Sequence, residues 1–372
     1  MSRVPGDSSA ADARPVSDSR PDTAGASADL RDRLERLPPD HPSSFYEADG
    51  RRREPGPRLR DLDTGSDDGA LAEDSDVAGD DSSDWRADDS QQADAGLRFT
   101  DAEWSEHRAE TRAFIGGANA ADMASYRQYT VDPDNQAWTA ERRSAHDMII
   151  NSIYAQAQDV PDDRAAIIAG GMCGAGKTTV LNEYASIDRS QYLTISPDDI
   201  KEELARRGLV PEVDGLSPME ASDLVHRESS YIAHQLALRA RADGKNHIWD
   251  ITMSSRDSTQ DRINDLREAG YERVEAIFVH IPVGVSLQRA DARHREGEEK
   301  YQSGVGLGGR YVPPEAITSQ ADDEWGSTNR RAFEELKPRF DRWDQYDNSV
   351  DGRKPVLVET SSRDDSPERS IS

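Results

Sequence analysis

The stretch Gly171–Thr178, with the sequence GMCGAGKT, constrains this chain more than any other part of it. It fits the phosphate-loop pattern G-x-x-x-x-G-K-[ST], in which glycines allow backbone N–H groups to turn toward a polyphosphate. The apolar run Arg164–Ala169 before it predicts a buried strand, and Thr179–Ala185 after it predicts a helix whose N-terminus faces the same anion. A strand, this loop and a helix in that order indicate a nucleotide-phosphate site.

The loop also predicts individual contacts. Lys177 can reach the β- and γ-phosphates, and the hydroxyl of Thr178 can bind Mg²⁺. The residues that we expect to contact the nucleotide are Gly171, Gly174, Ala175, Gly176, Lys177, Thr178 and Thr179.

Composition limits the protein class. The chain has 372 residues, a formal net charge of −27 and one cysteine, Cys173, so a disulfide within the chain is impossible and a reducing cytoplasm is expected. No apolar run approaches the roughly 20 residues of a membrane span, and the first residues lack the apolar stretch of a signal peptide. The acidic balance disfavours binding to nucleic acid or to an anionic membrane.

Four regions follow from the distribution of residue types. Residues 1–95 are rich in Ala, Ser, Asp and Gly and predict a disordered acidic tail, because such a segment cannot bury enough apolar surface to offset its conformational entropy. Residues 96–136 predict a poorly defined connector with some helix, 137–360 the phosphate-loop domain, and 361–372 a disordered C-terminus.

Within 137–360, strand patterns alternate with helix patterns. Helices are expected at Thr139–Gln156, from Pro197 to near Gly208, from a capping box at Ser217–Glu220 to Asp243, at Ser258–Ala269, at Val285–Arg295, and around Phe333, Leu336, Phe340 and Trp343. Strands are expected at Gln191–Ile195, Asn246–Asp250, Val274–Ile281 and Val356–Val358, besides the strand before the loop. The prediction is an α/β fold with a parallel sheet of about five strands flanked by helices.

Ligands of open α/β sheets bind beyond the carboxyl ends of the strands, so polar residues at those ends are candidates for chemistry. Asp198 follows the second strand and is the candidate general base for an acceptor hydroxyl, although Asp198 and Asp199 also suit the first turn of a helix. Asp250 closes the third strand and can hold Mg²⁺ or bind the acceptor, with Thr252 beside it.

Further candidates lie on helices and loops. Glu228 and His234 are expected on a helix that borders the cleft, either as acceptor-binding residues or on a solvated face. Arg289 and Arg293 are spaced i, i+4, which is unfavourable unless an anion such as phosphate lies between them. Arg310 ends a glycine-rich segment and has the position of a lid arginine.

The motifs GGMCGAGKTT, TISPDDIK, WDIT, RADAR and GRYVP, in this order, resemble the zeta-toxin family of phosphate-loop kinases over roughly residues 140–360. The resemblance implies a P-loop kinase fold and ATP- and Mg²⁺-dependent phosphorylation of UDP-N-acetylglucosamine at the 3′-hydroxyl of the sugar. It also implies a toxin that poisons peptidoglycan synthesis and is blocked by a separate antitoxin protein. By position, Lys177, Asp198, Arg293 and Arg310 match the family's catalytic residues.

Two departures from the family pattern fall on the acceptor side. Asp250 stands where the family has a glutamate, with Thr252 matching its threonine, and His234 stands at a second glutamate position, for which Glu228 is a nearby substitute. Two alternatives therefore remain. One is a kinase for another hydroxylated metabolite or an antibiotic, and the other is a non-catalytic, nucleotide-dependent interaction protein.

Overall fold

The computed structural model describes residues 98–132 and 137–361, so the predicted acidic tail and nearly all of the predicted C-terminal tail lie outside the described residues. The α-helices span Asp101–Ile115 (α2), Ala118–Met123 (α3), Ser125–Gln128 (α4), Ala140–Gln156 (α5), Lys177–Glu183 (α6), Pro197–Arg206 (α7), His226–Ala242 (α8), Arg256–Glu268 (α9), Val283–Gln302 (α10), Pro314–Thr318 (α11) and Thr328–Leu336 (α12). Short 3₁₀ helices span Arg189–Gln191 (η3), Ala221–Val225 (η4) and Lys337–Arg339 (η5).

The strands span Thr130–Asp132 (β1), Ala137–Trp138 (β2), Ala165–Gly170 (β3), Leu193–Ile195 (β4), His247–Asp250 (β5), Arg273–His280 (β6), Ala321–Asp322 (β7), Gly326–Ser327 (β8), Arg342–Asp347 (β9) and Val356–Thr360 (β10). Six of them form the central sheet in the order β10-β9-β6-β3-β5-β4. All pairs in it are parallel except β9 with β10, which is antiparallel. The predicted α/β fold is confirmed; the sheet has six strands in place of about five, and its edge strand β10 is antiparallel to the rest.

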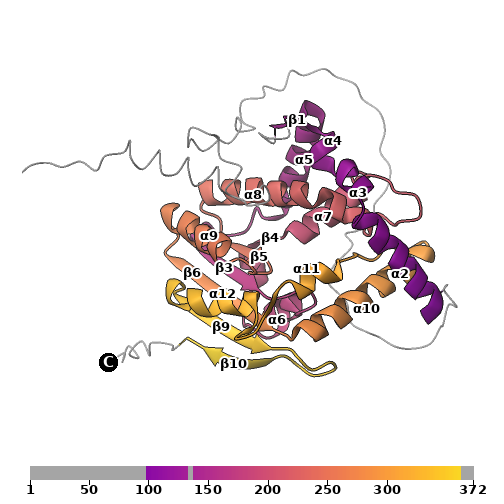
Figure 1. Ribbon diagram of the computed structural model, residues 1–372. Coiled ribbons are helices and arrows are strands. Elements are labelled where there is room, and N and C mark those ends of the chain that lie inside the picture. The colour runs from indigo at the N-terminus through magenta and orange to yellow at the C-terminus, as the bar shows by residue number, and fades with distance from the viewer. Residues whose placement is uncertain (1–97, 133–136, 362–372) are drawn as a thin grey trace, which may run out of the picture.

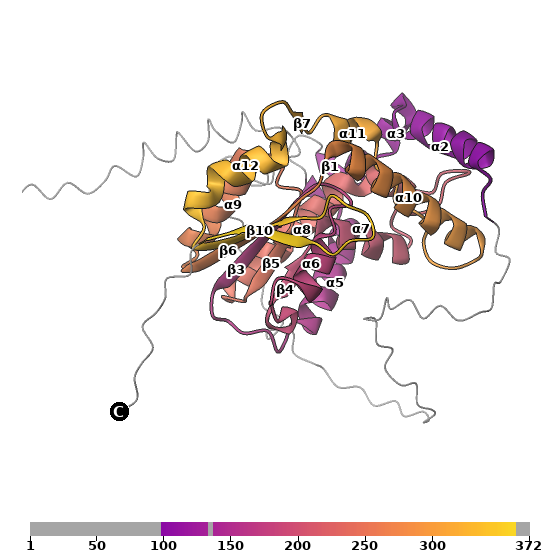
Figure 2. The same cartoon turned by 90° about the horizontal axis from the view of Figure 1, so that it is seen from below.

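Helices cover both faces of the sheet, as Figures 1 and 2 show. Because side chains alternate along a strand, β3 sends Ile168 to one face and Ile167 to the other, and both are fully buried. Ile168 belongs to a core with residues of α5, α7, α8, α9 and α12. Ile167 belongs to a second core with residues of α6 and α10. Burying one such side chain contributes roughly 1.5–3 kcal/mol, so the two cores hold a three-layer domain together.

Two expectations about helices are corrected. The capping box is present, since Glu220 N–H donates to Ser217 Oγ and Ser217 N–H donates to Glu220 Oε2. However, it opens the 3₁₀ helix η4, and α8 begins only at His226. The helix expected through Trp343 ends at Leu336, because Pro338 follows in η5 and the chain then extends as β9, the strand missing from the prediction.

The segment before the sheet contains the helices α2, α3 and α4, and it packs on the domain. Thr100 caps α2 through a complete capping box with Glu103. Trp104 on the same helix is buried and meets His294 of α10 edge-on, with ring centroids 4.6 Å apart. Figure 1 shows α2 lying beside α10, far in sequence from it. Helix α2 is therefore part of the folded unit.

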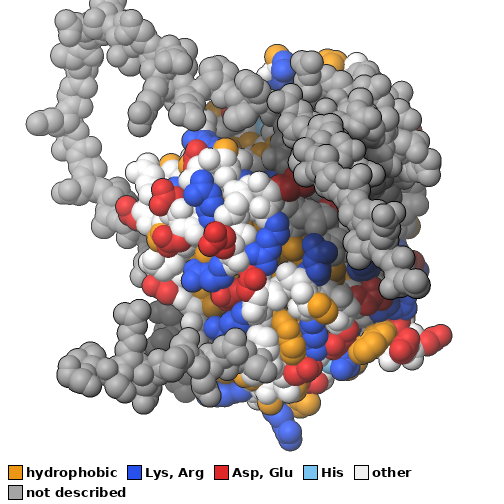
Figure 3. Space-filling view, turned by 90° about the vertical axis from the view of Figure 1, so that its left-hand side faces the viewer, with side chains coloured by type: hydrophobic (Ala, Val, Ile, Leu, Met, Phe, Trp, Pro, Cys, Tyr) orange, Lys and Arg blue, Asp and Glu red, His pale blue; other side chains and the backbone are white. Residues whose placement is uncertain are grey.

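The surface is mixed in charge where it can be seen. In the space-filling view of Figure 3, acidic and basic side chains are interspersed over the visible face. Exposed pairs such as Arg206 with Glu202 and Glu203 are consistent with this mixture. Within residues 98–132 and 137–361, no helix is both long and apolar enough to cross a bilayer.

Candidate active site

The phosphate loop connects β3 to α6 and is shaped by its glycines. Gly171, Gly174 and Gly176 all have positive φ, the region that side chains disfavour. A Cβ at Gly171 would lie 2.5 Å from the carbonyl oxygen of Val279, and one at Gly176 would lie 2.6 Å from Asn348 Nδ2. The loop backbone is thus held close to β6 and to the segment after β9, and only glycine fits at these two positions.

Lys177 links the loop to the end of β5. Its Nζ lies 3.4 Å from Asp250 Oδ1 and donates a hydrogen bond of 3.2 Å to the carbonyl oxygen of Gly171. The two elements meet because β3 and β5 are parallel neighbours, with Ala169 opposite Asp250. The structure therefore brings together the predicted phosphate-binding lysine and the predicted strand-end carboxylate.

Asp198 and Arg310 form an ion pair. Ser196 caps α7 and Pro197 occupies its first turn, which places Asp198 at the carboxyl end of β4. Arg310 Nη1 lies 2.5 Å from Asp198 Oδ2, and the arginine side chain is mostly buried whereas the carboxylate is half exposed. Desolvation of the buried part of this side chain raises the pKa of Asp198, but the charges of Arg310, Lys201 and Lys177 outweigh this effect and hold the pKa at about 2. Asp198 is therefore ionised throughout the neutral range.

Asp199 behaves differently from its neighbour. Partial desolvation, together with the negative charges of Asp250 and Glu202, raises the pKa of Asp199 to about 6, although the residue keeps contact with solvent. Its backbone N–H donates to Ser196 Oγ, the cap of the helix. The pKa values of the two adjacent carboxyl groups thus shift in opposite directions, because Asp198 faces the cations Arg310, Lys201 and Lys177 whereas Asp199 faces the carboxylates of Asp250 and Glu202.

Arg289 and Arg293 place one face of α10 against the phosphate loop. Arg289 donates to the carbonyl oxygens of Gly174 and Asn348, at 3.1 and 2.8 Å, and is paired with Asp351. Arg293 Nη2 lies 3.3 Å from Cys173 Sγ. The anion expected between the two arginines is, for Arg289, the carboxylate of Asp351. Both guanidinium groups nevertheless border the loop.

The expected role of Glu228, as an acceptor-binding residue or as part of a solvated helix face, is corrected by the structure. The residue is completely buried near the start of α8, where Arg142 donates to both of its oxygens, at 2.6 and 2.9 Å, and His146 Nε2 lies 2.6 Å from Oε1. Burial raises the pKa of Glu228, but the hydrogen bonds from His146 and Arg142 outweigh this and lower it. The carboxylate joins α5 to α8 and lies neither on a solvated face nor free to bind an acceptor.

His234 and Thr252 lie near Asp250 but make different contacts. His234 is buried in α8 and borders a small cavity with Trp249 and Arg262. The hydroxyl of Thr252 lies 3.1 Å from Ser254 Oγ, and its carbonyl oxygen accepts from the N–H of Gly171. Thr252 therefore lies beside the loop, whereas His234 packs beneath the strand that carries Asp250.

Three further residues at the carboxyl edge of the central sheet were not predicted from the sequence. Asn348 Nδ2 donates to the carbonyl oxygen of Ala175, and Asn329 Nδ2 donates to that of Thr252. Neither belongs to a motif, so no sequence signal indicated them. Lys201 is buried one helical turn after Asp198, and burial lowers its pKa. Its i, i+3 spacing from Asp198 was a usable signal.

The sequence model of the zeta toxin family matches residues 152–346. Two solved structures of AvrRxo1-ORF1 with AvrRxo1-ORF2, one with sulphate ions and one with ATP, each contain a similar chain. In both, that chain is 18% identical to this one, and the match covers 62% of this chain and 72% of that chain with a TM-score of 0.47.

The PezAT chromosomal toxin–antitoxin system of Streptococcus pneumoniae is 17% identical over 60% of this chain and 82% of its own, with a TM-score of 0.42. No curated protein matches the sequence significantly. The family match covers more than half of the 372 residues and includes the phosphate loop, Asp198, Asp250 and Arg310. This chain belongs to the zeta toxin family of phosphate-loop kinases.

Proposed function

We propose that the protein transfers the γ-phosphoryl group of ATP to a hydroxyl group of a small molecule, with UDP-N-acetylglucosamine and its sugar 3′-hydroxyl as the first candidate. In this proposal it is the toxin of a toxin–antitoxin system, with a separate antitoxin protein as partner. One observation carries the chemistry. Lys177, Asp198, Asp250 and Arg310 converge at the carboxyl ends of three neighbouring parallel strands. Family membership supports the class of substrate.

The residues present fit ATP and Mg²⁺. The loop is a cradle that a Cβ at Gly171 or Gly176 would obstruct. In this proposal Lys177, whose Nζ lies over the loop backbone at Gly171, binds phosphate oxygens, and Arg289 and Arg293 line the same loop. The hydroxyl of Thr178 and the carboxylate of Asp250 are oxygen donors of the kind that Mg²⁺ prefers. A bound Mg²⁺ would neutralise charge on the phosphates.

Asp198 and Arg310 have linked roles in this mechanism. The acceptor hydroxyl must lose a proton, and Asp198 is the carboxylate that accepts it. A carboxylate with a pKa of about 2 is a weak base while it is paired with Arg310. When the guanidinium turns toward the transferring phosphoryl group, it neutralises charge there, and the basicity of Asp198 increases. The same movement of Arg310 thus neutralises charge on the phosphoryl group and makes Asp198 a stronger base.

A second candidate function is a kinase for another hydroxylated metabolite or an antibiotic. The residues expected to contact the acceptor, Glu228 and Asp250, favour it. Glu228, the substitute for a family glutamate, is held internally by Arg142 and His146. Asp250 is one methylene shorter than the residue it replaces. These differences change which acceptor groups can be contacted, while the phosphate loop and Asp198 are unaffected.

The test is product formation. Purified protein is incubated with Mg²⁺, ATP labelled at the γ-phosphate and a panel containing UDP-N-acetylglucosamine, other nucleotide sugars, free sugars and aminoglycosides, and products are identified by mass spectrometry. We expect one phosphorylated acceptor, and none with Lys177→Ala. A product from a different acceptor selects the second candidate. Nucleotide binding without transfer to any acceptor or to a cell metabolite extract would indicate the non-catalytic alternative.

A further inference from the structure

Three potential metal ligands converge away from the phosphate loop. His107 of α2, Glu220 at the start of η4 and His294 of α10 offer atoms that all lie within 4.8 Å of one another. The Nε2 atoms of both histidines approach the same carboxylate oxygen, Glu220 Oε1, at 2.6 and 2.7 Å. The side chains of His107, Glu220 and His294 are 15%, 0% and 2% exposed. Three separate elements therefore present ligand atoms to one buried point.

The surroundings fix the orientation of these side chains. The second carboxylate oxygen, Glu220 Oε2, accepts the N–H of Ser217 at 3.0 Å. Phe99 stacks on His107, with centroids 5.4 Å apart, and Trp104 meets the ring of His294 edge-on. A hydrogen bond to the carboxylate, such as the one from Ser217, is typical of a metal-ligating carboxylate. The group is thus pre-oriented in the protein as it stands.

We propose that His107, Glu220 and His294 bind a divalent transition-metal ion, with zinc as the best match. Two imidazole nitrogens and one carboxylate oxygen form a common zinc ligand set, with a further position left for water. Zinc bonds of about 2.0–2.2 Å in a tetrahedron require ligand atoms roughly 3.3 Å apart. The ligand atoms must separate by about 0.6 Å from their present hydrogen-bond distances, which small side-chain rotations can supply.

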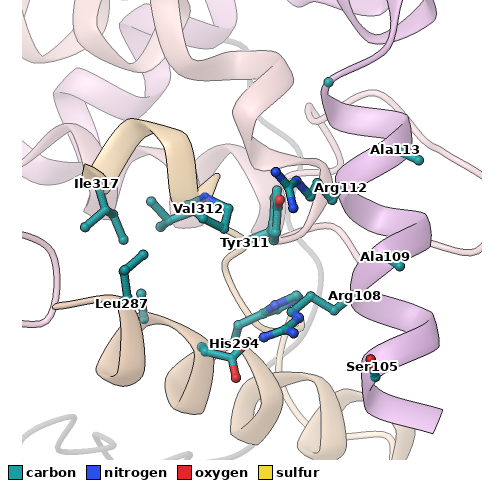
Figure 4. Close-up of a pocket in the computed structure, with 14 residues that line it drawn as sticks. Ser105, Arg108, Ala109, Arg112, Ala113, Leu287, His294, Tyr311, Val312 and Ile317 are labelled. Atoms are coloured by element: carbon teal, nitrogen blue, oxygen red, sulfur yellow. Dashed lines mark hydrogen bonds and ion pairs between the residues drawn. The ribbon is translucent and has the colours of Figure 1, made fainter. Parts of the chain in front are cut away.

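A cavity adjoins the group on the side of His294. His294 borders a cavity of about 650 Å³ between α2 and α10, which is also lined by Arg108, Tyr311 and Leu287. Figure 4 shows His294 extending from α10 toward α2, with Arg108 across the gap. In the proposal that follows from this group, an ion would enter from the cavity past His294.

The position of the group suggests what the ion does. The turn that carries Glu220 packs on the glycine-rich segment before Arg310, since Met219 N–H donates to the carbonyl oxygen of Leu307. A Cβ at Gly309 would overlap the carbonyl oxygen of His294. Helix α2 lies outside residues 152–346, the part that matches the family. A bound ion would therefore fasten α2 to the segment that delivers Arg310 to Asp198.

The experiment measures zinc on the full-length chain, purified without a histidine tag and stripped with a chelating resin. We expect one zinc ion per chain by elemental analysis after addition of ZnCl₂ and gel filtration. We also expect a Tm rise of about 5 °C or more at saturating zinc. Cobalt(II) should give the intense visible absorption of a tetrahedral site.

The decisive variants are His107→Gln and His294→Gln, because a glutamine amide can still donate a hydrogen bond to Glu220 but is a poor zinc ligand. We expect both to fold without zinc and to lose at least about 10²-fold in zinc affinity, together with the zinc-induced Tm shift. His226→Gln, an exposed histidine outside the group, is the matched control and should behave as the unmodified chain.

Zinc content near zero in the unmodified chain, with no Tm shift, would overturn the proposal and identify the group as a hydrogen-bond network. Equal zinc binding by the unmodified chain and both glutamine variants would also overturn it, since the ion would then be bound elsewhere. Neither readout involves phosphoryl transfer, so the result is independent of the proposed function.

Discussion

Asp198 Oδ2 and Arg310 Nη1 lie 2.5 Å apart although one residue follows β4 and the other follows the glycine-rich segment after α10. This ion pair joins the candidate base to the candidate charge-neutralising group before any substrate is bound. Its effect is visible in the pKa of Asp198, about 2, beside the pKa of Asp199, about 6. The pair therefore helps to keep Asp198 ionised in mildly acidic solution, whereas desolvation and the charges of Asp250 and Glu202 favour the protonated form of Asp199.

Arg310→Gln should lower kcat and move the acid limb of the pH–rate profile upward. Removing the guanidinium removes the main charge that holds the pKa of Asp198 down, so Asp198 becomes protonated at a higher pH than in the unmodified protein. We expect kcat to fall by roughly 10²–10³, and the pH of half-maximal kcat/KM on the acid side, which reports the free enzyme, to rise. Arg310→Lys is the control, because it keeps the charge. A lower rate with an unchanged acid limb would separate Arg310 from the ionisation of Asp198.

Asp198→Asn should reduce the rate far more than Asp199→Asn. Asparagine caps and packs much like aspartate but cannot accept the proton. For Asp198→Asn we expect kcat to fall by roughly 10²–10⁴ with ATP affinity little changed, measured at saturating ATP and acceptor. Asp199→Asn is the matched control at the next position. Equal and small effects would exclude Asp198 as the base and leave positioning and charge neutralisation as the source of catalysis.

The sequence was sufficient to predict the residues at strand ends. Lys177, Asp198 and Asp250 each follow a strand that the apolar pattern identifies, and parallel strands bring their carboxyl ends to one edge. Contacts between distant segments were not predictable in this way. Nothing near Glu228 in the sequence indicates that Arg142 and His146 enclose it, because its partners lie on another helix.

Strand β9 shows that distant contacts also limit the prediction of the fold from the sequence. Phe333, Leu336, Phe340 and Trp343 keep a helical spacing, which favoured a single helix. In the structure, β9 pairs with β6 and buries the polar Asp344 and Gln345. Asp344 is stabilised by Arg342 and by the hydroxyl of Thr360 on β10. Pairing with neighbouring strands, rather than the local pattern, makes this polar segment a strand.

Glu228→Gln should destabilise the protein and leave catalysis nearly intact. The substitution leaves the charge of the buried Arg142 without its counter-ion, which costs about 3–5 kcal/mol in typical buried pairs. Urea unfolding measures the loss. Glu202→Gln, in the exposed pair with Arg206, is the control and should cost less than about 1 kcal/mol. A large fall in kcat of the folded Glu228→Gln protein would restore Glu228 to the acceptor site.

His247 should make the stability of the protein fall as the pH is lowered from 7.5 to 5. It is fully buried in β5, next to the carbonyl oxygen of Lys245 and the hydroxyl of Tyr271, and burial lowers its pKa to about 4. An unfolded chain has an ordinary histidine with a pKa near 6.5. Between these values the unfolded chain binds the proton and the folded protein does not, so stability is present above pH 6.5 and is lost as the pH falls toward 4. At pH 5 the loss from this residue should be about 2 kcal/mol.

The test for His247 compares urea unfolding at pH 7.5 and at pH 5 for the unmodified protein, His247→Asn and His247→Gln. Each variant will have its own stability at pH 7.5, but both should show a pH dependence smaller by about 2 kcal/mol. Parallel pH dependences in all three proteins would mean that His247 is protonated in the folded state and that acid sensitivity arises elsewhere.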